Sequence, residues 1–120
     1  MRDIEHRLQC GCVRWLRLQY PELLCFAIPN GGARNAVTGA RLKAEGVLAG
    51  VPDLMIAEPR GYWAGLFVEM KTEKGVLSAE QKQMMQTLIK KGYYFAVCRS
   101  FDDFRQTVTE YMRKADTGQI

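Results

Sequence analysis

The pattern that most constrains the fold is a pair of apolar segments, residues 53–57 and 63–71, separated by a turn sequence around Gly61. Each segment is short and bounded by residues typical of turns, so the pair predicts a β-hairpin. In a hairpin, the residue numbers of opposed positions add up to a constant. If the turn is centred on Gly61, that constant is 122 and Asp53 lies opposite Glu69.

This hairpin would bring three charged side chains into one small patch. The Cβ atoms of directly opposed residues are about 4.5–5.5 Å apart, and Lys71 projects from the same face of its strand as Glu69. Two opposed carboxylates repel each other unless a cation lies between them. Carboxylate oxygens without a histidine or cysteine partner favour Mg²⁺ or Mn²⁺. The pattern therefore predicts a divalent-metal site at Asp53 and Glu69.

A site of this kind has the chemistry needed to hydrolyse a phosphodiester bond. A hydrated metal ion activates one of its waters, and Lys71 would orient that water or stabilise the charge that develops on the phosphate. The expected mechanism is in-line attack of the water, with Asp53 and Glu69 as metal ligands. The alternative is a plain ion pair between Lys71 and either carboxylate. The bare Asp…Glu-x-Lys spacing by itself favours that alternative, because such triplets are common by chance.

The rest of the chain is expected to supply helices and further strands. Helices are predicted at about residues 4–20, 38–45, 78–91 and 101–114, and strands at 23–28, 53–57, 63–71 and 93–99. Asp3, Ser78 and Ser100 are the expected N-caps, and Gly92 is expected just after the third helix. The order α-β-(α)-β-β-α-β-α predicts an α/β or α+β domain with a central mixed sheet flanked by helices.

Length and composition limit what this domain can be. A chain of 120 residues with 48% hydrophobic residues suits one globular domain, which we expect to span 1–120. No apolar segment approaches the roughly 20 residues that cross a bilayer, and the charged N-terminus lacks the apolar core of a signal peptide. Four cysteines and one histidine do not make a disulfide scaffold or a zinc site. The net charge of +4, spread over both halves, permits a polyanionic partner without requiring one.

The residues around the hairpin resemble a known family. Residues 50–54 (Gly-Val-Pro-Asp-Leu) and 67–71 (Phe-Val-Glu-Met-Lys) resemble the signature of the PD-(D/E)xK nucleases. More narrowly, the chain is similar to the VRR-NUC domain, the virus-type replication-repair nuclease module, in its stand-alone form. The resemblance extends to the opening helix with Glu5, to the loop at 30–32 and to residues 77–81 (Leu-Ser-Ala-Glu-Gln). It implies a restriction-endonuclease-like core and metal-dependent cleavage of DNA.

The resemblance also implies roles for particular residues. In this family the acidic residue after the proline and the Glu of the Glu-x-Lys pair bind the metal, which here are Asp53 and Glu69. A glutamate on the opening helix and a glutamine in the following helix complete the family's site, and these fall on Glu5 and Gln81. Glu5 would bind the metal directly or through water, and the backbone carbonyl of Met70 is a further expected ligand. Together with Lys71, the four side chains form the expected catalytic set.

Gln81 also fits a purely structural role. With Ser78 it forms the Ser-x-x-Gln pattern of a capping box, in which the glutamine side chain bonds the backbone amide of the N-cap residue. The sequence supports this interpretation about as well as the catalytic one. The family resemblance favours the catalytic interpretation.

Residues near the hairpin are candidates for contacts to a nucleic acid. The expected contacts are Asn30, Gly31, Arg34, Arg41, Lys43, Lys74 and Lys82. The two arginines and Lys43 lie in or after the Gly-rich loop and precede Asp53, so the loop can present them beside the metal. Lys74 and Lys82 lie near a helix N-terminus, whose dipole attracts phosphate. The alternative for both lysines is simple solvation.

Together these features predict a Mg²⁺- or Mn²⁺-dependent DNA endonuclease of replication, recombination or repair, in the cytoplasm of a bacterium or of a phage or virus host. A chain this short leaves little room for reading sequence, so branched or flapped DNA such as a Holliday junction is the expected substrate. Because a symmetric junction needs two cuts, a homodimer is expected. The alternatives are a restriction-type endonuclease, a non-catalytic nucleic-acid-binding module of the same fold and an unrelated interaction domain.

Overall fold

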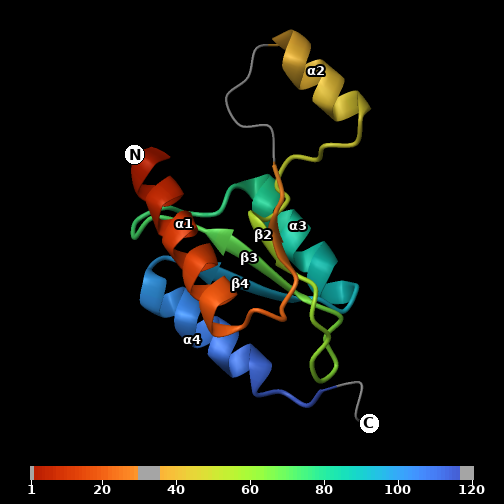
Figure 1. The fold of residues 1–120 in the computed structure, drawn as a ribbon. Coiled ribbons are helices and arrows are strands. Elements are labelled where there is room, and N and C mark those ends of the chain that lie inside the picture. The colour runs from red at the N-terminus through yellow and green to blue at the C-terminus, as the bar shows by residue number, and fades with distance from the viewer. Residues whose placement is uncertain (1, 30–35, 117–120) are drawn as a thin grey trace.

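A computed structural model describes residues 2–29 and 36–116 and shows a four-stranded sheet flanked by helices. The elements are α1 (Arg2–Gln19), β1 (Cys25–Ala27), α2 (Ala36–Ala44), β2 (Leu54–Ile56), β3 (Leu66–Met70), α3 (Ala79–Lys90), β4 (Tyr94–Cys98) and α4 (Phe101–Met112). Their order confirms the predicted succession of helices and strands (Figure 1). None of the helices in the described ranges has the length and apolarity that crossing a membrane requires.

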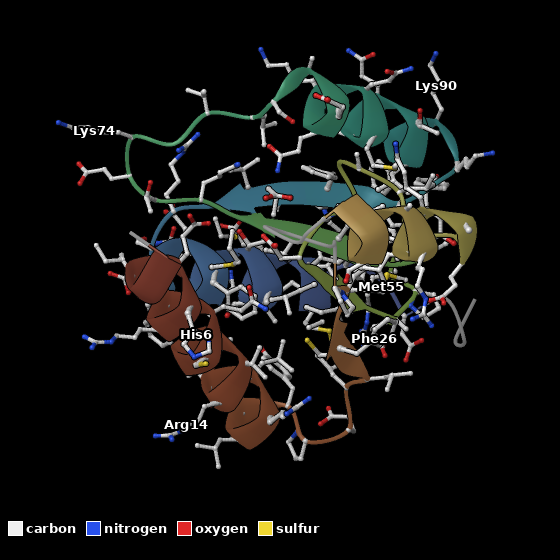
Figure 2. The ribbon with its side chains drawn as sticks, turned by 90° about the horizontal axis from the view of Figure 1, so that it is seen from above. His6, Arg14, Phe26, Met55, Lys74 and Lys90 are labelled. Atoms are coloured by element: carbon white, nitrogen blue, oxygen red, sulfur yellow. The ribbon has the colours of Figure 1, made fainter. Side chains whose placement is uncertain are left out.

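The sheet is mixed, as predicted, and has the strand order β1-β2-β3-β4. The strands β1 and β3 both run antiparallel to β2, while β4 runs parallel to β3. Parallel neighbours need a crossover connection, and α3 provides it. Figure 2 shows the resulting layers, with α3 on one face of the sheet and α1 and α4 on the other.

The hairpin between β2 and β3 has the predicted register. The pairing that begins at Leu54 and Val68 keeps the sum of residue numbers at 122 along both strands. The turn itself differs in detail, because Arg60 pairs with Trp63 and the sum becomes 123 there. One extra residue is therefore accommodated on the arm that leads into the turn. Gly61 has a φ of +58° in this turn, a conformation that glycine adopts at no steric cost.

Several predicted element ends are wrong by a few residues. The strands β2 and β3 stop short of Asp53 and Lys71, which lie immediately outside them. The first helix begins at Arg2, so Asp3 lies inside α1 and is not its N-cap. The strands β1 and β4 and the helix α4 are shorter than predicted, and α2 begins earlier, at Ala36. Apolar patterns locate the buried face of an element, whereas its ends depend on a few local hydrogen bonds.

The N-caps of α3 and α4 are confirmed. The hydroxyl oxygen of Ser78 accepts a hydrogen bond from the backbone N–H of Gln81, and that of Ser100 accepts one from the N–H of Asp103. The Asp103 carboxylate bonds the N–H of Arg99, one residue before the cap. Both helices therefore begin at positions fixed by side chains, which determines where the loops before them end.

The hydrophobic core lies between the sheet and the two helices α1 and α4. Completely buried side chains of the strands, such as Leu54 and Val68, meet Leu16 of α1 and Phe104 of α4. On the opposite face, α3 contributes no fully buried residue. Burial of apolar area therefore holds α1 and α4 more strongly than α3, and the position of α3 depends more on local contacts at its ends.

One such contact joins the start of α3 to the backbone of Gly50. Gly50 has a φ of +87°, and a Cβ atom added there would lie 2.6 Å from the carbonyl oxygen of Glu80. Only a residue without a side chain avoids this clash and also tolerates the left-handed conformation. The contact holds the first turn of α3, which carries Gln81, against the segment that leads into β2.

We expect Gly50→Ala to lower the free energy of unfolding by about 1–3 kcal/mol, because alanine would be strained at this φ and would push α3 outward. Chemical denaturation measures the change. Gly11→Ala is the matched control, since Gly11 lies inside α1 with open space around it, and alanine there should add roughly 0.5–1 kcal/mol. A Gly50→Ala protein as stable as the parent would contradict this contact.

Candidate active site

Glu69 of β3 is a buried carboxyl group with a second carboxyl group beside it. The residue is 3% exposed, and no other charged residue in the described ranges is as deeply buried. Burial, and after it the negative charge of Asp53, raises the pKa of the Glu69 carboxyl group to about 8. A carboxyl group whose ionisation is made this unfavourable by its surroundings is a strong candidate for a functional residue.

Asp53 lies opposite Glu69 in the observed register, directly before β2. Its carboxylate oxygen Oδ2 accepts a hydrogen bond of 2.7 Å from the backbone N–H of Met70. Its backbone carbonyl accepts a second bond, of 2.8 Å, from the N–H of Ile28, just after β1. The side chain is thus tied to β3 and the backbone to the end of β1, so the two carboxyl groups are held together by the sheet itself.

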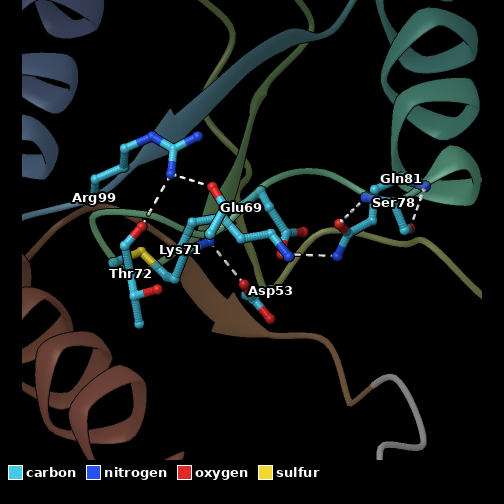
Figure 3. A network of polar contacts seen from close by, with 9 residues as sticks. Asp53, Glu69, Lys71, Thr72, Ser78, Gln81 and Arg99 are labelled. Atoms are coloured by element: carbon cyan, nitrogen blue, oxygen red, sulfur yellow. Dashed lines mark hydrogen bonds and ion pairs between the residues drawn. The ribbon is translucent and has the colours of Figure 1, made fainter. Parts of the chain in front are cut away.

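Gln81 forms the predicted capping box and also bonds Glu69. Its Oε1 accepts a hydrogen bond from the N–H of Ser78, and the Ser78 hydroxyl accepts one from the N–H of Gln81, which completes the capping box. Because a backbone N–H can only donate, the amide oxygen must face Ser78. The opposite end of the amide then turns towards Glu69, and Nε2 donates to Oε2 at 3.1 Å. Figure 3 shows this bridge from α3 to β3.

The charges of Lys71, directly after β3, and of Glu5, on α1, both act on the same carboxyl group. The Nζ atom of Lys71 lies 3.9 Å from Oε2 of Glu69, and its charge lowers the pKa of that group, although less than burial raises it. At that distance the two charges attract without a hydrogen bond, so the donors of the ammonium remain available to a ligand. The charge of Glu5, on α1, acts in the opposite direction and raises the pKa of Glu69.

The donor atoms fit a hard divalent cation. Oε1 of Glu69 is buried without a hydrogen-bond partner, and a cation placed between it and Asp53 would satisfy that oxygen and cancel the repulsion of the two charges. The part of the chain that the structure describes contains no cluster of three or more acidic, histidine or cysteine side chains that could hold a metal. The protein therefore offers a pair of carboxylates, and water or substrate oxygens would supply the rest. Mg²⁺ commonly binds in this way.

The residue Arg99, which the sequence did not single out, organises the loop between β3 and α3. Its Nη1 donates to the carbonyl oxygens of Thr72, at 2.9 Å, and of Glu73 and Gly75 (Figure 3). The loop begins directly after Lys71 and ends at the cap of α3. Arg99 therefore fixes the path of the chain between two elements of the site. An arginine at the end of a strand gives no local pattern from which this role could be found.

The residues predicted to grip a nucleic acid are only partly described. Asn30, Gly31 and Arg34 lie outside the described residues. Arg41 and Lys43 are exposed on α2, which stands apart from the sheet (Figure 1). The segment that carries α2 leaves the body after β1 and returns just before β2, so both of its ends lie next to Asp53.

Lys74 and Lys82 lie on the other side of the site. Lys74 is exposed in the β3–α3 loop, and Figure 2 shows its side chain pointing outward from that loop. Lys82 is exposed in the first turn of α3, one residue after Gln81. Along the chain Lys74 is the nearer of the two to Glu69, whereas Lys82 lies beside Gln81, whose side chain bonds Glu69.

Comparison with known proteins places this geometry in a family. The family model of the VRR-NUC domain matches residues 2–102. A solved structure described as a VRR-NUC domain protein is similar to this chain, with a TM-score of 0.78 and 25% sequence identity, over 93% of this chain and 90% of the other. No curated protein matches the chain.

The buried carboxyl group predicts how the stability of the metal-free protein depends on pH. The pKa of Glu69 is raised in the folded state to about 8 from an ordinary value of 4.5. Between these values the folded state keeps a proton that the unfolded state releases, so this group's contribution to stability falls as the pH rises. The measurement is the Tm of the parent minus the Tm of Glu69→Gln, both in chelator. We expect this difference to fall by roughly 5 °C or more between pH 5 and pH 8.

Glu73→Gln is the matched control for this experiment, because Glu73 is an exposed carboxylate in the same part of the molecule. Its Tm should follow that of the parent across the pH range. A parent whose Tm stays at a constant offset from that of Glu69→Gln would show that Glu69 is ionised throughout, which would contradict the burial described above.

The role of Arg99 predicts a local change in backbone protection. Arg99→Ala removes the donor that three carbonyl groups of the β3–α3 loop share. Amide hydrogens of the loop and of the first turn of α3 should then exchange faster, and the protein should lose about 1–3 kcal/mol of stability. Hydrogen exchange read by mass spectrometry measures the effect. Arg105→Ala, at an exposed position on α4, should leave the exchange of that loop unchanged, and equal exchange in both variants would contradict the role.

Proposed function

Because this chain belongs to the VRR-NUC family, which is a family of nucleases, we propose that it is a metal-dependent endonuclease that hydrolyses phosphodiester bonds of branched or flapped DNA. The residues proposed to carry the reaction are Asp53, Glu69, Lys71, Gln81 and Glu5. We further propose that residues 1–120 act as one nuclease domain.

The observation that carries the proposal is the buried pair of carboxyl groups. Oε1 of Glu69 accepts a hydrogen bond from no donor in the described residues, and the interaction with the Asp53 carboxyl group raises the pKa of Glu69. A structural ion pair does not explain it, because the nearest ammonium, that of Lys71, lies on the side of Oε2 at 3.9 Å. Mg²⁺ or Mn²⁺ is the proposed occupant, since both prefer carboxylate, carbonyl and water oxygens. The Met70 carbonyl is the proposed backbone ligand, and Glu5 would act through water.

A bound divalent ion would lower the pKa of a coordinated water and reduce the negative charge of the scissile phosphate. The chain's own residues have separate tasks around it. Met70, through its N–H, keeps the Asp53 carboxylate in place, and Gln81 keeps Glu69 in one orientation. Lys71 would donate to the phosphate oxygen on which negative charge develops, where a fixed ammonium in a partly buried site is most effective.

Three features support a branched substrate over a linear one. The described elements form one sheet with helices packed around it, and none of them is a separate element that could read a base sequence. The exposed helix α2 carries Arg41 and Lys43 and projects from the edge of the site (Figure 1), where it can reach a second arm of DNA. Contacts to phosphates recognise the path of the backbone and not its sequence. A symmetric junction requires two cuts, so a homodimer is the proposed working state.

The test is a cleavage panel with the purified chain. Four-way junction, flapped, splayed and linear duplex DNA are each incubated with Mg²⁺, with Mn²⁺ and with chelator, and products are separated on a denaturing gel. We expect cleavage of at least one branched substrate with metal and none with chelator. Lys71→Met should lower the rate by about 100-fold or more, because the developing charge loses its fixed donor.

Two further variants separate chemistry from folding. Glu69→Gln removes the buried charge, so it should raise stability in chelator at pH 8 while abolishing cleavage. Lys90→Met is the matched control for Lys71→Met, because Lys90 is exposed in the last turn of α3, far along the helix from Gln81 (Figure 2). A folded Lys71→Met protein that cuts as fast as Lys90→Met would refute the proposed role of Lys71, and cleavage in chelator would refute the role of the metal.

A further inference from the structure

The outer strand β1 has a free edge in the described sheet, because its one neighbour there is β2. The N–H of Ile28 bonds the carbonyl of Asp53, so the backbone groups of Ile28 face β2. In an antiparallel pair, alternate residues direct their backbone groups to the same neighbour. The backbone groups of Phe26 therefore also face β2, and those of Cys25 and Ala27 face outward.

A contact of Arg17 agrees with this orientation. Arg17 donates through Nη2 to the carbonyl oxygen of Cys25 at 3.4 Å, which it can reach because that carbonyl faces away from β2. Among the described residues, the outward N–H and C=O groups of Cys25 and Ala27 make no other hydrogen bond. An unpaired edge of this kind is where a further strand can add to a sheet.

A groove runs along this edge, between β1 and α1. Its volume is about 860 Å³, within the roughly 300–1,000 Å³ typical of ligand-binding pockets. The wall on α1 extends from His6 to Leu18, about 18 Å along the helix axis. An extended peptide of about five or six residues has this length. The groove is therefore long enough for one added strand.

The α1 wall of the groove is positively charged. Arg14 and Arg17 line it together with His6, and no acidic side chain is among the described residues that line the groove. The bond to Cys25 uses one of the five N–H groups of Arg17. Guanidinium groups bind carboxylates strongly through such donors. Acidic side chains would therefore fit on the face of an added strand that points towards α1.

The opposite face of β1 is apolar and exposed. Phe26 pairs with Met55, and Met55 pairs with Phe67, so these three side chains lie on the sheet face away from α1. Phe26 is 43% exposed, and Leu24, two residues before it, is 61% exposed. Apolar side chains would therefore fit on the face of an added strand that points away from α1.

We propose that the free edge of β1 binds an extended peptide segment of a partner protein, which adds to the sheet as a further strand and alternates acidic with apolar residues. Its acidic side chains would face Arg14 and Arg17, and its apolar side chains would lie beside Phe26 and Leu24. The inference goes beyond the proposed nuclease function and does not depend on the carboxylate pair.

Two other occupants fit these features less well. A second copy of this chain, paired edge to edge through β1, would bring the arginines of two α1 walls together, and Cys25–Ala27 carries no carboxylate to compensate them. A nucleic acid would contact the arginines through its phosphates. It does not, however, supply the regular series of N–H and C=O groups that pairs with the edge of a strand.

The test measures the binding of a synthetic peptide. An eight-residue, fluorescein-labelled peptide that alternates aspartate with valine is titrated with the full chain in chelator, and fluorescence anisotropy gives the affinity. A peptide with four aspartates followed by four valines should bind about tenfold more weakly, because its acidic residues cannot all face the arginines. Equal affinity of the two peptides would contradict the proposed alternation.

Ala27→Pro tests the strand pairing. Proline removes the outward N–H of Ala27 without removing a bond to β2, and edge strands tolerate proline at such positions. The affinity for the alternating peptide should fall by about tenfold, the effect of roughly one lost hydrogen bond. Ala27→Val is the matched control, because it keeps the N–H and changes an exposed side chain. Equally tight binding by Ala27→Pro and Ala27→Val would overturn the proposed pairing.

A double variant tests the charged wall. Replacing Arg14 and Arg17 together by alanine should weaken peptide binding by about tenfold, and by less as the salt concentration rises. Arg105 and Arg113 are exposed on and just after α4, so the double alanine variant there removes the same charge outside the groove. It should bind the peptide as the parent does, and an equal loss in both double variants would overturn the assignment to the α1 wall.

Two results would assign the edge to another occupant. If the peptide does not bind, but a dT12 oligonucleotide binds and the Arg14 and Arg17 variant loses it, the groove takes a nucleic acid and the proposal is wrong. If the peptide does not bind, and Ala27→Pro turns a dimer into a monomer in sedimentation, the edge belongs to a second copy and the proposal is equally wrong. A chain that cuts no DNA but binds the peptide as described would refute the nuclease proposal alone.

Discussion

The burial of the Glu69 carboxyl group beside Asp53 is the constraint around which the site is organised. The sheet register brings these two carboxyl groups together, and they repel each other whenever both are ionised. The groups nearby each reduce part of this repulsion: the backbone N–H of Met70 bonds Asp53, Gln81 bonds Glu69, and Lys71 supplies a positive charge. One oxygen remains without a partner, so the compensation is complete only when something further binds.

The two faces of the sheet divide stability from chemistry. The face that packs on α1 and α4 carries the completely buried side chains, including Met70 and Val68. The opposite face carries Glu69, and the helix that covers it contributes no fully buried residue. Alternation along β3 therefore places a core side chain and a site side chain at neighbouring positions. The well-packed face keeps the strand rigid, so the carboxylate pair keeps its geometry although α3 is lightly held.

The sequence predicted those parts of the site that depend on strand periodicity. The turn around Gly61 and the two apolar segments were enough to place Asp53 opposite Glu69, because register in a short hairpin follows from counting residues. From the sequence, the capping role of Gln81 and a place in the site were alternatives. In the structure the oxygen of its amide faces Ser78 and the nitrogen faces Glu69, and a sequence does not show how a side-chain amide is oriented. The contacts of the Arg99 side chain and of Gly50 could not be predicted, since each reaches backbone groups far away in the chain.

The hydrogen bond between the N–H of Ile28 and the carbonyl of Asp53 has a consequence for how this fold can diversify. It closes the base of the segment that runs out from β1 through α2 and returns to β2. A segment that is clamped at its base can be lengthened, shortened or exchanged without altering the strands on either side, since the entropy cost of a longer loop grows only slowly with its length. Relatives could therefore differ in this segment while the carboxylate pair at its base stays in place.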